Sequence, residues 1–200
     1  MRAFVHFMKW RLGITVADHW MMPEESTCLL RHAAGRKRLA EVGVWEGGTT
    51  RRLREVMAPD AILVAIDPYP PGRSGINYQK VIAAREVAAV QNGTVVWLRQ
   101  TGAEAARTRC VLAAPFDFVF VDGDHTYEGI RGDWEAWSPL IERDGIIALH
   151  DALQVEGKVD AGSIRYSNEV VVRDPRFEIV DEVFTLRVLR RRASEIAGAS

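Results

Sequence analysis

The chain has 200 residues, a formal net charge of −1, 48% hydrophobic residues and 26% charged residues. This size and composition are typical of one globular domain with a substantial core. A net charge so close to zero argues against nonspecific nucleic-acid binding. No apolar run is long enough to span a bilayer, and the first ten residues lack the apolar core of a signal peptide. Cys28 and Cys110 have no metal-ligand spacing, so we expect reduced thiols and a cytoplasmic protein.

Residues 1–36 form an N-terminal segment rich in large apolar side chains. Pro23 to Ser26 predicts a helix start, and residues 27–34 are expected to form one short helix. Such a segment can cap a ligand site, contact a second copy of the chain in a homo-oligomer, or simply pack on the sheet. The sequence leaves these three interpretations open.

From residue 37 onward, short apolar runs alternate with helical patterns. Strands are predicted at 38–43, 61–66, 94–98, 116–121 and 145–149. Helices are predicted at 49–57, 77–91, 103–113, 126–142 and 163–173. The alternation predicts a doubly wound α/β fold with a parallel sheet.

The end of the chain breaks this alternation. Two further strands, 177–180 and 183–189, are joined through Asp181 and Glu182, a link so short that it permits only an antiparallel hairpin. We therefore expect a mostly parallel seven-stranded sheet in a domain spanning residues 37–192. Residues 193–200 are then a tail.

A glycine-rich turn follows the first predicted strand, with the spacing Glu41-x-Gly43-x-x-x-Gly47. A strand, a glycine turn and a helix N-terminus together make a ligand platform, because glycines admit close approach and the helix start offers free N–H groups. Glu41 on a buried strand needs a partner. The alternative interpretation is an ordinary turn between a strand and a helix.

Two further strand ends carry polar residues that suit a nucleoside. Asp67 ends the second strand, where a carboxylate can accept hydrogen bonds from both hydroxyls of a ribose. It can also simply begin an Asp-Pro turn. After the third strand, residues 100–104 are expected to border the adenine, although Thr101 and Glu104 also have the spacing of a helix capping box.

The strongest local signal lies at the ends of the fourth and fifth strands. Asp122, Asp124 and His125 follow one strand, and His150 and Asp151 end the other. Neighbouring parallel strands would bring these side chains to one edge of the sheet. Two carboxylates there suit a hard cation such as Mg²⁺, and a histidine suits proton transfer. The structural alternative has the aspartates capping helices and the histidines bonded within a polar pocket.

These motifs together resemble a known family. Residues 119–130, Asp133, Trp137, Leu140 and residues 145–151 are similar to bacterial class I S-adenosylmethionine-dependent methyltransferases, in the group that contains macrocin-type, cephalosporin-type and sugar O-methyltransferases. The resemblance covers residues 38–190, and the Asp-Gly-Asp-His-Thr-Tyr-Glu-Gly string from Asp122 is its most specific part.

The resemblance implies a Rossmann-like methyltransferase fold and methyl transfer from S-adenosylmethionine to a hydroxyl of a small molecule or sugar. The catalytic residues implied are His125 as base and Asp122. The implied cofactor contacts are Glu41, Gly43, Gly47, Asp67, Gly102, Ala103 and Asp122. In metal-dependent members an Asp ends the fourth strand and an acidic pair ends the fifth, so the implied Mg²⁺ ligands are Asp122, His150 and Asp151.

His150 departs from the family pattern, since metal-dependent members carry Glu there and imidazole is a poor ligand for Mg²⁺. The sequence also admits two other functions. A catalytically inactive nucleoside-binding partner protein on the same fold would not need His125 and Asp151 together. A nicotinamide-dependent dehydrogenase would be expected to carry Gly-x-Gly-x-x-Gly and no terminal hairpin.

Overall fold

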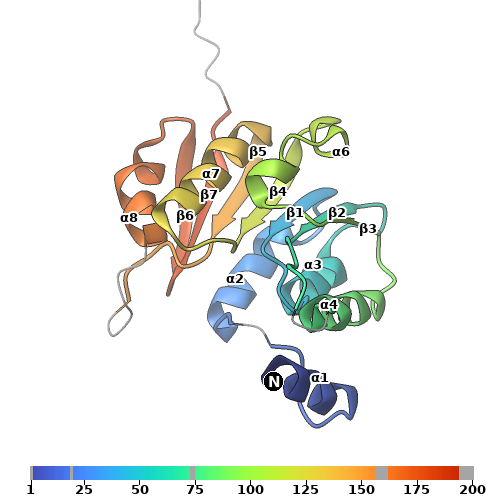
Figure 1. Cartoon of the computed structure of the whole chain (residues 1–200). Helices are drawn as coiled ribbons and strands as arrows, with labels where there is room; N and C mark the ends of the chain where they lie inside the picture. The colour runs from blue at the N-terminus through green and yellow to red at the C-terminus, as the bar shows by residue number, and fades with distance from the viewer. Residues whose placement is uncertain (1, 19, 73–74, 156–161, 194–200) are drawn as a thin grey trace, which may run out of the picture.

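The computed structural model describes residues 2–18, 20–72, 75–155 and 162–193. They form one seven-stranded sheet with helices on both sides (Figure 1). The strands are β1 (Arg38–Val42), β2 (Ile62–Ile66), β3 (Thr94–Leu98), β4 (Phe116–Val121), β5 (Ile141–Leu149), β6 (Phe177–Val183) and β7 (Leu186–Arg191). The helices are α1 (Arg2–Arg11), α2 (Pro23–Ala33), α3 (Gly48–Val56), α4 (Tyr78–Ala88), α5 (Gly102–Ala105), α6 (Arg109–Leu112), α7 (Tyr127–Trp137) and α8 (Gly162–Glu169), with 3-10 turns η1 (Ser138–Leu140) and η2 (Val171–Arg173).

The strand order is β3-β2-β1-β4-β5-β7-β6. The first five strands are parallel, and β7 pairs antiparallel with both β5 and β6. The predicted doubly wound sheet with a terminal hairpin is therefore confirmed. The chain leaves β1 toward β2 on one side and reaches β4 on the other, and this reversal opens a crevice at the carboxyl ends of β1 and β4.

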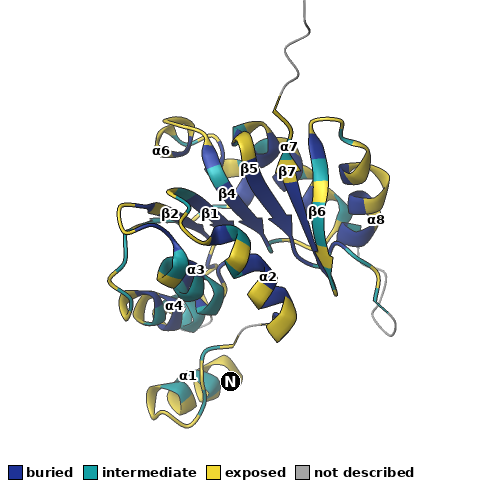
Figure 2. Cartoon of the chain, turned by 180° about the vertical axis from the view of Figure 1, so that it is seen from behind, coloured by how far each residue is buried: buried dark blue, intermediate teal, exposed yellow. Residues whose placement is uncertain are grey.

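Alternate residues along the central strands point to opposite faces of the sheet and pack into a separate hydrophobic core on each face. Ala40 and Val42 of β1 pack with α5, α6, α7 and α8 on one face, whereas Leu39 packs with α2 and α3 on the other. Figure 2 shows the central strands buried and the covering helices exposed on their outer sides. Both sheet faces are thus covered, as the near-continuous apolar strands predict.

Some predicted boundaries are wrong. The helix predicted at 103–113 is two short helices, because Thr108 adopts an extended conformation and caps α6. The helix predicted at 126–142 ends at Trp137, since Pro139 cannot continue an α-helix, and β5 begins four residues early at Ile141. Helix 163–173 is divided into α8 and η2.

The hairpin and the N-terminus also differ from the prediction. The hairpin turns at Phe184 and Thr185, not at Asp181 and Glu182, and Phe184 has a positive φ of 49° that the turn requires. Helix α1 was not predicted. It packs on α4, where Phe7 stacks against Tyr78 at a centroid distance of 5.0 Å. No helix of the described residues is long and apolar enough to cross a membrane.

Candidate functional site

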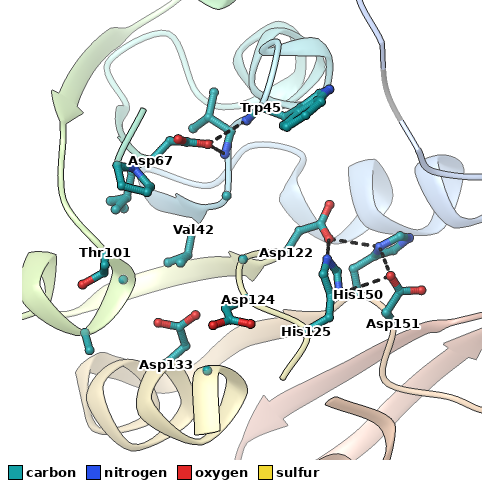
Figure 3. A pocket seen from close by; sticks show the side chains of 18 of the residues that line it. Val42, Trp45, Asp67, Thr101, Asp122, Asp124, His125, Asp133, His150 and Asp151 are labelled. Carbon is teal, nitrogen blue, oxygen red and sulfur yellow. Dashed lines mark hydrogen bonds and ion pairs between the residues drawn. The ribbon is translucent and has the colours of Figure 1, made fainter. Parts of the chain in front are cut away.

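A cavity of about 970 Å³ opens at the crevice between β1 and β4 (Figure 3). Most predicted site residues line it: Gly43, Asp67, Gly102, Ala103, Asp122, His125, His150 and Asp151. Glu41 and Gly47 are not among its lining residues. The lining also includes Asp18, Trp20, Val42, Thr101, Asp124 and Asp133.

Glu41 lies behind the glycine turn and is fully buried. Neither of its carboxyl oxygens has a hydrogen-bond partner among the described residues. Burial raises the pKa of Glu41 well above its ordinary value, with smaller contributions from the charges of Asp122 and Asp67. The neighbouring Thr50 hydroxyl, which makes no well-formed hydrogen bond to Glu41, only partly opposes the rise. A buried carboxyl in this state is costly unless a ligand supplies a donor or a positive charge.

Asp67 joins the end of β2 to the turn that follows β1 through hydrogen bonds to backbone N–H groups. Its Oδ2 accepts hydrogen bonds from the backbone N–H groups of Val44, at 3.2 Å, and Trp45, at 3.0 Å. Its Oδ1 accepts from Tyr69 N at 2.9 Å. The carboxylate therefore shapes the glycine turn and also lines the cavity (Figure 3).

The loop after β3 contains the capping box that the sequence left as an alternative. Thr101 Oγ1 accepts from Glu104 N at 3.4 Å, and Glu104 Oε2 accepts from Thr101 N at 3.0 Å. This pair fixes the start of α5 and so fixes Gly102 and Ala103 at the cavity wall.

Four ionisable side chains meet at the ends of β4 and β5 (Figure 3). His125 Nδ1 lies 3.2 Å from Asp151 Oδ2, and its Nε2 lies 3.9 Å from Asp122 Oδ1. The His125 side chain is 46% exposed, so it faces the open side of the cavity. The tautomer with a proton on Nδ1 donates to Asp151 and leaves Nε2 as an acceptor, which is the arrangement of a histidine base.

His150 is buried beneath this group. Its Nδ1 lies 3.1 Å from Asp122 Oδ1, and its Nε2 lies 3.4 Å from Glu25 Oε2. Burial alone would lower the pKa of His150, but the hydrogen bonds to Asp122 and Glu25 raise it to about 10. The charged imidazolium uses both nitrogens as donors, so His150 is engaged with carboxylates instead of offering a lone pair to a metal.

Sequence reasoning missed Glu25, which it took only as part of a helix start. Glu25 Oε1 accepts from Thr185 N at 2.8 Å and from Thr185 Oγ1 at 2.6 Å, and Oε2 accepts from Met22 N at 2.8 Å. Glu25 thereby joins α2 to the β6–β7 turn directly under His150. Glu25 is the third residue of α2, where its carboxylate accepts from Met22 N, and no sequence pattern indicated its contacts with Thr185 and His150.

The Glu25–His150 pair predicts how stability depends on pH. Burial alone would raise the pKa of Glu25, but hydrogen bonds from His150 and Thr185 lower it from 4.5 to about 2, so its contribution is complete above pH 4.5 and lost as the pH falls toward 2. The pKa of His150 rises from 6.5 to about 10, so its contribution is complete below pH 6.5 and lost as the pH rises through 10. Glu25 and His150 therefore both contribute fully to the stability of the fold only between pH 4.5 and pH 6.5.

We expect the unfolding free energy of the wild type to exceed that of His150→Gln by the largest margin between pH 4.5 and 6.5. Above pH 6.5 the margin should fall by up to about 1.4 kcal/mol per pH unit, because the unfolded chain then binds fewer protons than the folded one. Urea unfolding at pH 5.5, 7.0 and 8.5 measures it. A margin that stays constant with pH would show that folding leaves the pKa of His150 at its ordinary value, and a margin that rises from pH 5.5 to 7.0 would show that the folded protein holds His150 neutral.

The N-terminal segment reaches the cavity. His6 Nε2 lies 3.0 Å from Glu46 Oε2, and Asp18 N donates to the same oxygen at 2.7 Å. Glu46 is 3% exposed and belongs to the glycine-rich turn. These contacts hold Asp18 and Trp20 at the cavity edge.

Ligand atoms of Asp122, His125 and Asp151 lie within 4.8 Å of one another, as a metal site requires. The two carboxylates suit a hard divalent cation, and they stand side by side at the cavity wall. The predicted ligand set contains the same two aspartates.

The fold and the cavity define a class I methyltransferase architecture, and comparisons agree. The family model described as "Methyltransferase domain" matches residues 40–152, more than half of the chain. The chain belongs to this family. The predicted enzyme class, a methyltransferase, is thereby confirmed. No curated protein matches the chain.

Solved structures share the fold at low sequence identity. An O-methyltransferase from Bacillus cereus in complex with SAH is 13% identical with a TM-score of 0.64, covering 96% of this chain and 91% of that one. TomG, an O-methyltransferase from Streptomyces achromogenes involved in tomaymycin synthesis, in complex with SAM, is 18% identical with a TM-score of 0.63 and the same coverages. The N-methyltransferase NodS from Bradyrhizobium japonicum WM9 is 14% identical with a TM-score of 0.56, covering 85% and 96%. The fold alone therefore does not fix the accepting atom.

Proposed function

We propose that this methyltransferase transfers a methyl group from S-adenosylmethionine to a hydroxyl of a small molecule or sugar. The observation that carries the proposal is the meeting of His125, Asp122 and Asp151 at the wall of the same cavity that the glycine turn enters. A hydroxyl acceptor needs a base, and His125 is a histidine oriented by a carboxylate. Two structural neighbours, from Bacillus cereus and Streptomyces achromogenes, are O-methyltransferases, which is consistent with this acceptor.

The residues present fit the proposed cofactor. Glu41 offers two buried oxygens without partners close to the turn, and a cationic amino acid moiety would satisfy them. Asp67 lines the cavity with a carboxylate that can also accept from ribose hydroxyls. Gly43 lines the cavity, and its missing side chain lets the ends of β1 and β4 come close together beside it. S-adenosylmethionine supplies a methyl group already activated by a sulfonium.

The chain's own contribution is alignment and proton transfer. The acceptor hydroxyl is held at the ends of β4 and β5, in line with the methyl carbon. The cofactor would supply the methyl carbon and a sulfur that keeps the electrons of the broken carbon–sulfur bond, and His125 Nε2 takes the hydroxyl proton of the acceptor. Asp151 stabilises the imidazolium formed.

We further propose a divalent cation, Mg²⁺ or a similar hard ion, held by the carboxylates of Asp122 and Asp151. The cation would supply a positive charge that lowers the pKa of a bound hydroxyl. His150 then acts as a positioning residue that donates to Asp122, in place of the ligand role predicted from the family pattern. Residues 1–36 are proposed to cap the site, supported by Asp18 and Trp20 at its edge. Homo-oligomer formation and a cytoplasmic location stay predictions.

Two binding measurements and one assay test the proposal. Calorimetry should show S-adenosylhomocysteine binding and no NAD binding. Methyl transfer from labelled S-adenosylmethionine should proceed to hydroxyl acceptors, fall on treatment with EDTA and recover with Mg²⁺. Turnover unaffected by EDTA would overturn the proposed divalent cation but not the proposed role of His125 as base. Binding without turnover on any hydroxyl-rich acceptor library would instead favour the inactive partner protein.

A further inference from the structure

One buried carboxyl in the cavity wall is not used by the proposed chemistry. Asp133, on α7, is 6% exposed and lines the cavity. Among the described residues, none donates a hydrogen bond to it. Leaving a buried carboxyl without a partner costs free energy, so such a group in a ligand cavity points to a partner that the ligand brings.

Two glycines make the space that Asp133 occupies. A Cβ on Gly102 would lie 2.2 Å from Asp133 Oδ1, and a Cβ on Gly123 would lie 3.0 Å from Oδ2. Val42 Cγ1 lies beside both positions, so the cavity wall next to the Asp133 carboxyl is apolar. Figure 3 shows Asp133 pointing into the cavity between Thr101 and Asp124.

The cavity wall around Asp133 is rigid. Trp137, one turn further along α7, donates from Nε1 to Gly102 O at 3.0 Å and so binds α5 to α7. The capping box of Thr101 fixes the other end of the same loop. This part of the cavity wall, with small residues, the apolar Val42 side chain and one polar group, suits a planar heterocycle.

The charge state of Asp133 adds a chemical detail. Burial, together with the charge of Asp124, raises the pKa of Asp133 from 3.8 to about 7. The ionised group only accepts hydrogen bonds, whereas the acid form accepts on one oxygen and donates from the other. The 6-amino group and N1 of adenine form a neighbouring donor and acceptor, which the acid form matches.

We propose that Asp133 is the residue that selects adenine in the bound nucleoside, accepting a hydrogen bond from the 6-amino group. This inference rests on the proposed use of an adenosyl cofactor. A purine base without the 6-amino group offers no donor at this place and leaves the accepting oxygen of Asp133 unpaired. Asp133 is therefore a specificity residue at the opposite end of the nucleoside from Asp67.

The test uses calorimetry to compare S-adenosylhomocysteine with its 6-deamino analogue, in which unsubstituted purine replaces adenine. The wild type should prefer the adenosyl compound by at least about tenfold, the loss expected when a polar site faces an unmatched group. Asp133→Ala should bind the adenosyl compound about tenfold more weakly and lose most of the preference. Asp133→Asn, which keeps an acceptor and a donor, should retain the preference.

A matched control and a stability measurement separate recognition from structure. Glu135→Gln, on an exposed position of the same helix, should bind both compounds as the wild type does. Without ligand, Asp133→Ala should be at least as stable as the wild type, because the carboxyl it removes has no partner. A lower Tm for both Asp133→Ala and Asp133→Asn would instead assign Asp133 a structural role.

The two proposals fail in different ways. If the wild type binds neither compound, the proposed cofactor is wrong. If the wild type binds S-adenosylhomocysteine and Asp133→Ala discriminates as well as the wild type, the cofactor stands and the role of Asp133 is overturned.

Discussion

Replacing His125 with alanine is expected to lower kcat by about 10²- to 10⁴-fold, the range that a general base contributes. His125 Nδ1 lies 3.2 Å from Asp151 Oδ2, so its ring is oriented with Nε2 available to the acceptor hydroxyl. Binding of S-adenosylhomocysteine should change little, because the proposed nucleoside contacts, Asp67 and Asp133, lie away from His125 in the cavity (Figure 3). Steady-state kinetics and calorimetry on the same preparation separate the two effects.

His32→Ala is the matched control for His125. His32 also pairs with a carboxylate, Asp181, at 2.5 Å, but neither residue lines the cavity. The kcat of His32→Ala should equal that of the wild type. Methyl transfer that is undiminished in His125→Ala would remove His125 as the base.

Replacing Gly43 with alanine is expected to destabilise the fold by about 3 kcal/mol or more and to abolish cofactor binding. Gly43 has a φ of +93°, and a Cβ there would lie 2.0 Å from the carbonyl oxygen of Asp122. Both a strained conformation and a backbone collision result. Because the collision pushes apart the ends of β1 and β4, the cavity should close or distort. Urea unfolding and calorimetry with S-adenosylhomocysteine measure the two losses.

Gly35→Ala isolates the conformational part of this cost. Gly35 also has a positive φ, +71°, yet nothing lies within 4 Å of its would-be Cβ. The unfolding free energy of Gly35→Ala should fall by only about 1 to 2 kcal/mol, and cofactor binding should stay intact. Equal losses for the two variants would show that the contact between β1 and β4 is not tight in solution.

The sheet was predictable because apolar runs and their spacing encode it locally. Strand β3 has the predicted bounds, and β1, β2 and β4 differ by at most one residue. Errors occurred where a single residue decides a boundary. Pro139 ends α7, and Phe184 takes the left-handed conformation that sets the hairpin turn.

The site was predictable where polar residues follow strands that end at the same edge. Asp122, His125, His150 and Asp151 meet because β4 and β5 are parallel neighbours. The partners of these residues were not predictable in the same way. Glu25 reaches His150 across 125 sequence positions, and no local pattern encodes that contact.

The measurement that tests the central claim most directly is a crystal structure of the protein with S-adenosylhomocysteine and Mg²⁺. We expect the sulfur to face His125 and Asp122, the ribose to lie against Asp67, and the cation to be held by Asp122 and Asp151. Ligand bound outside this cavity, or sulfur turned away from the ends of β4 and β5, would contradict the account.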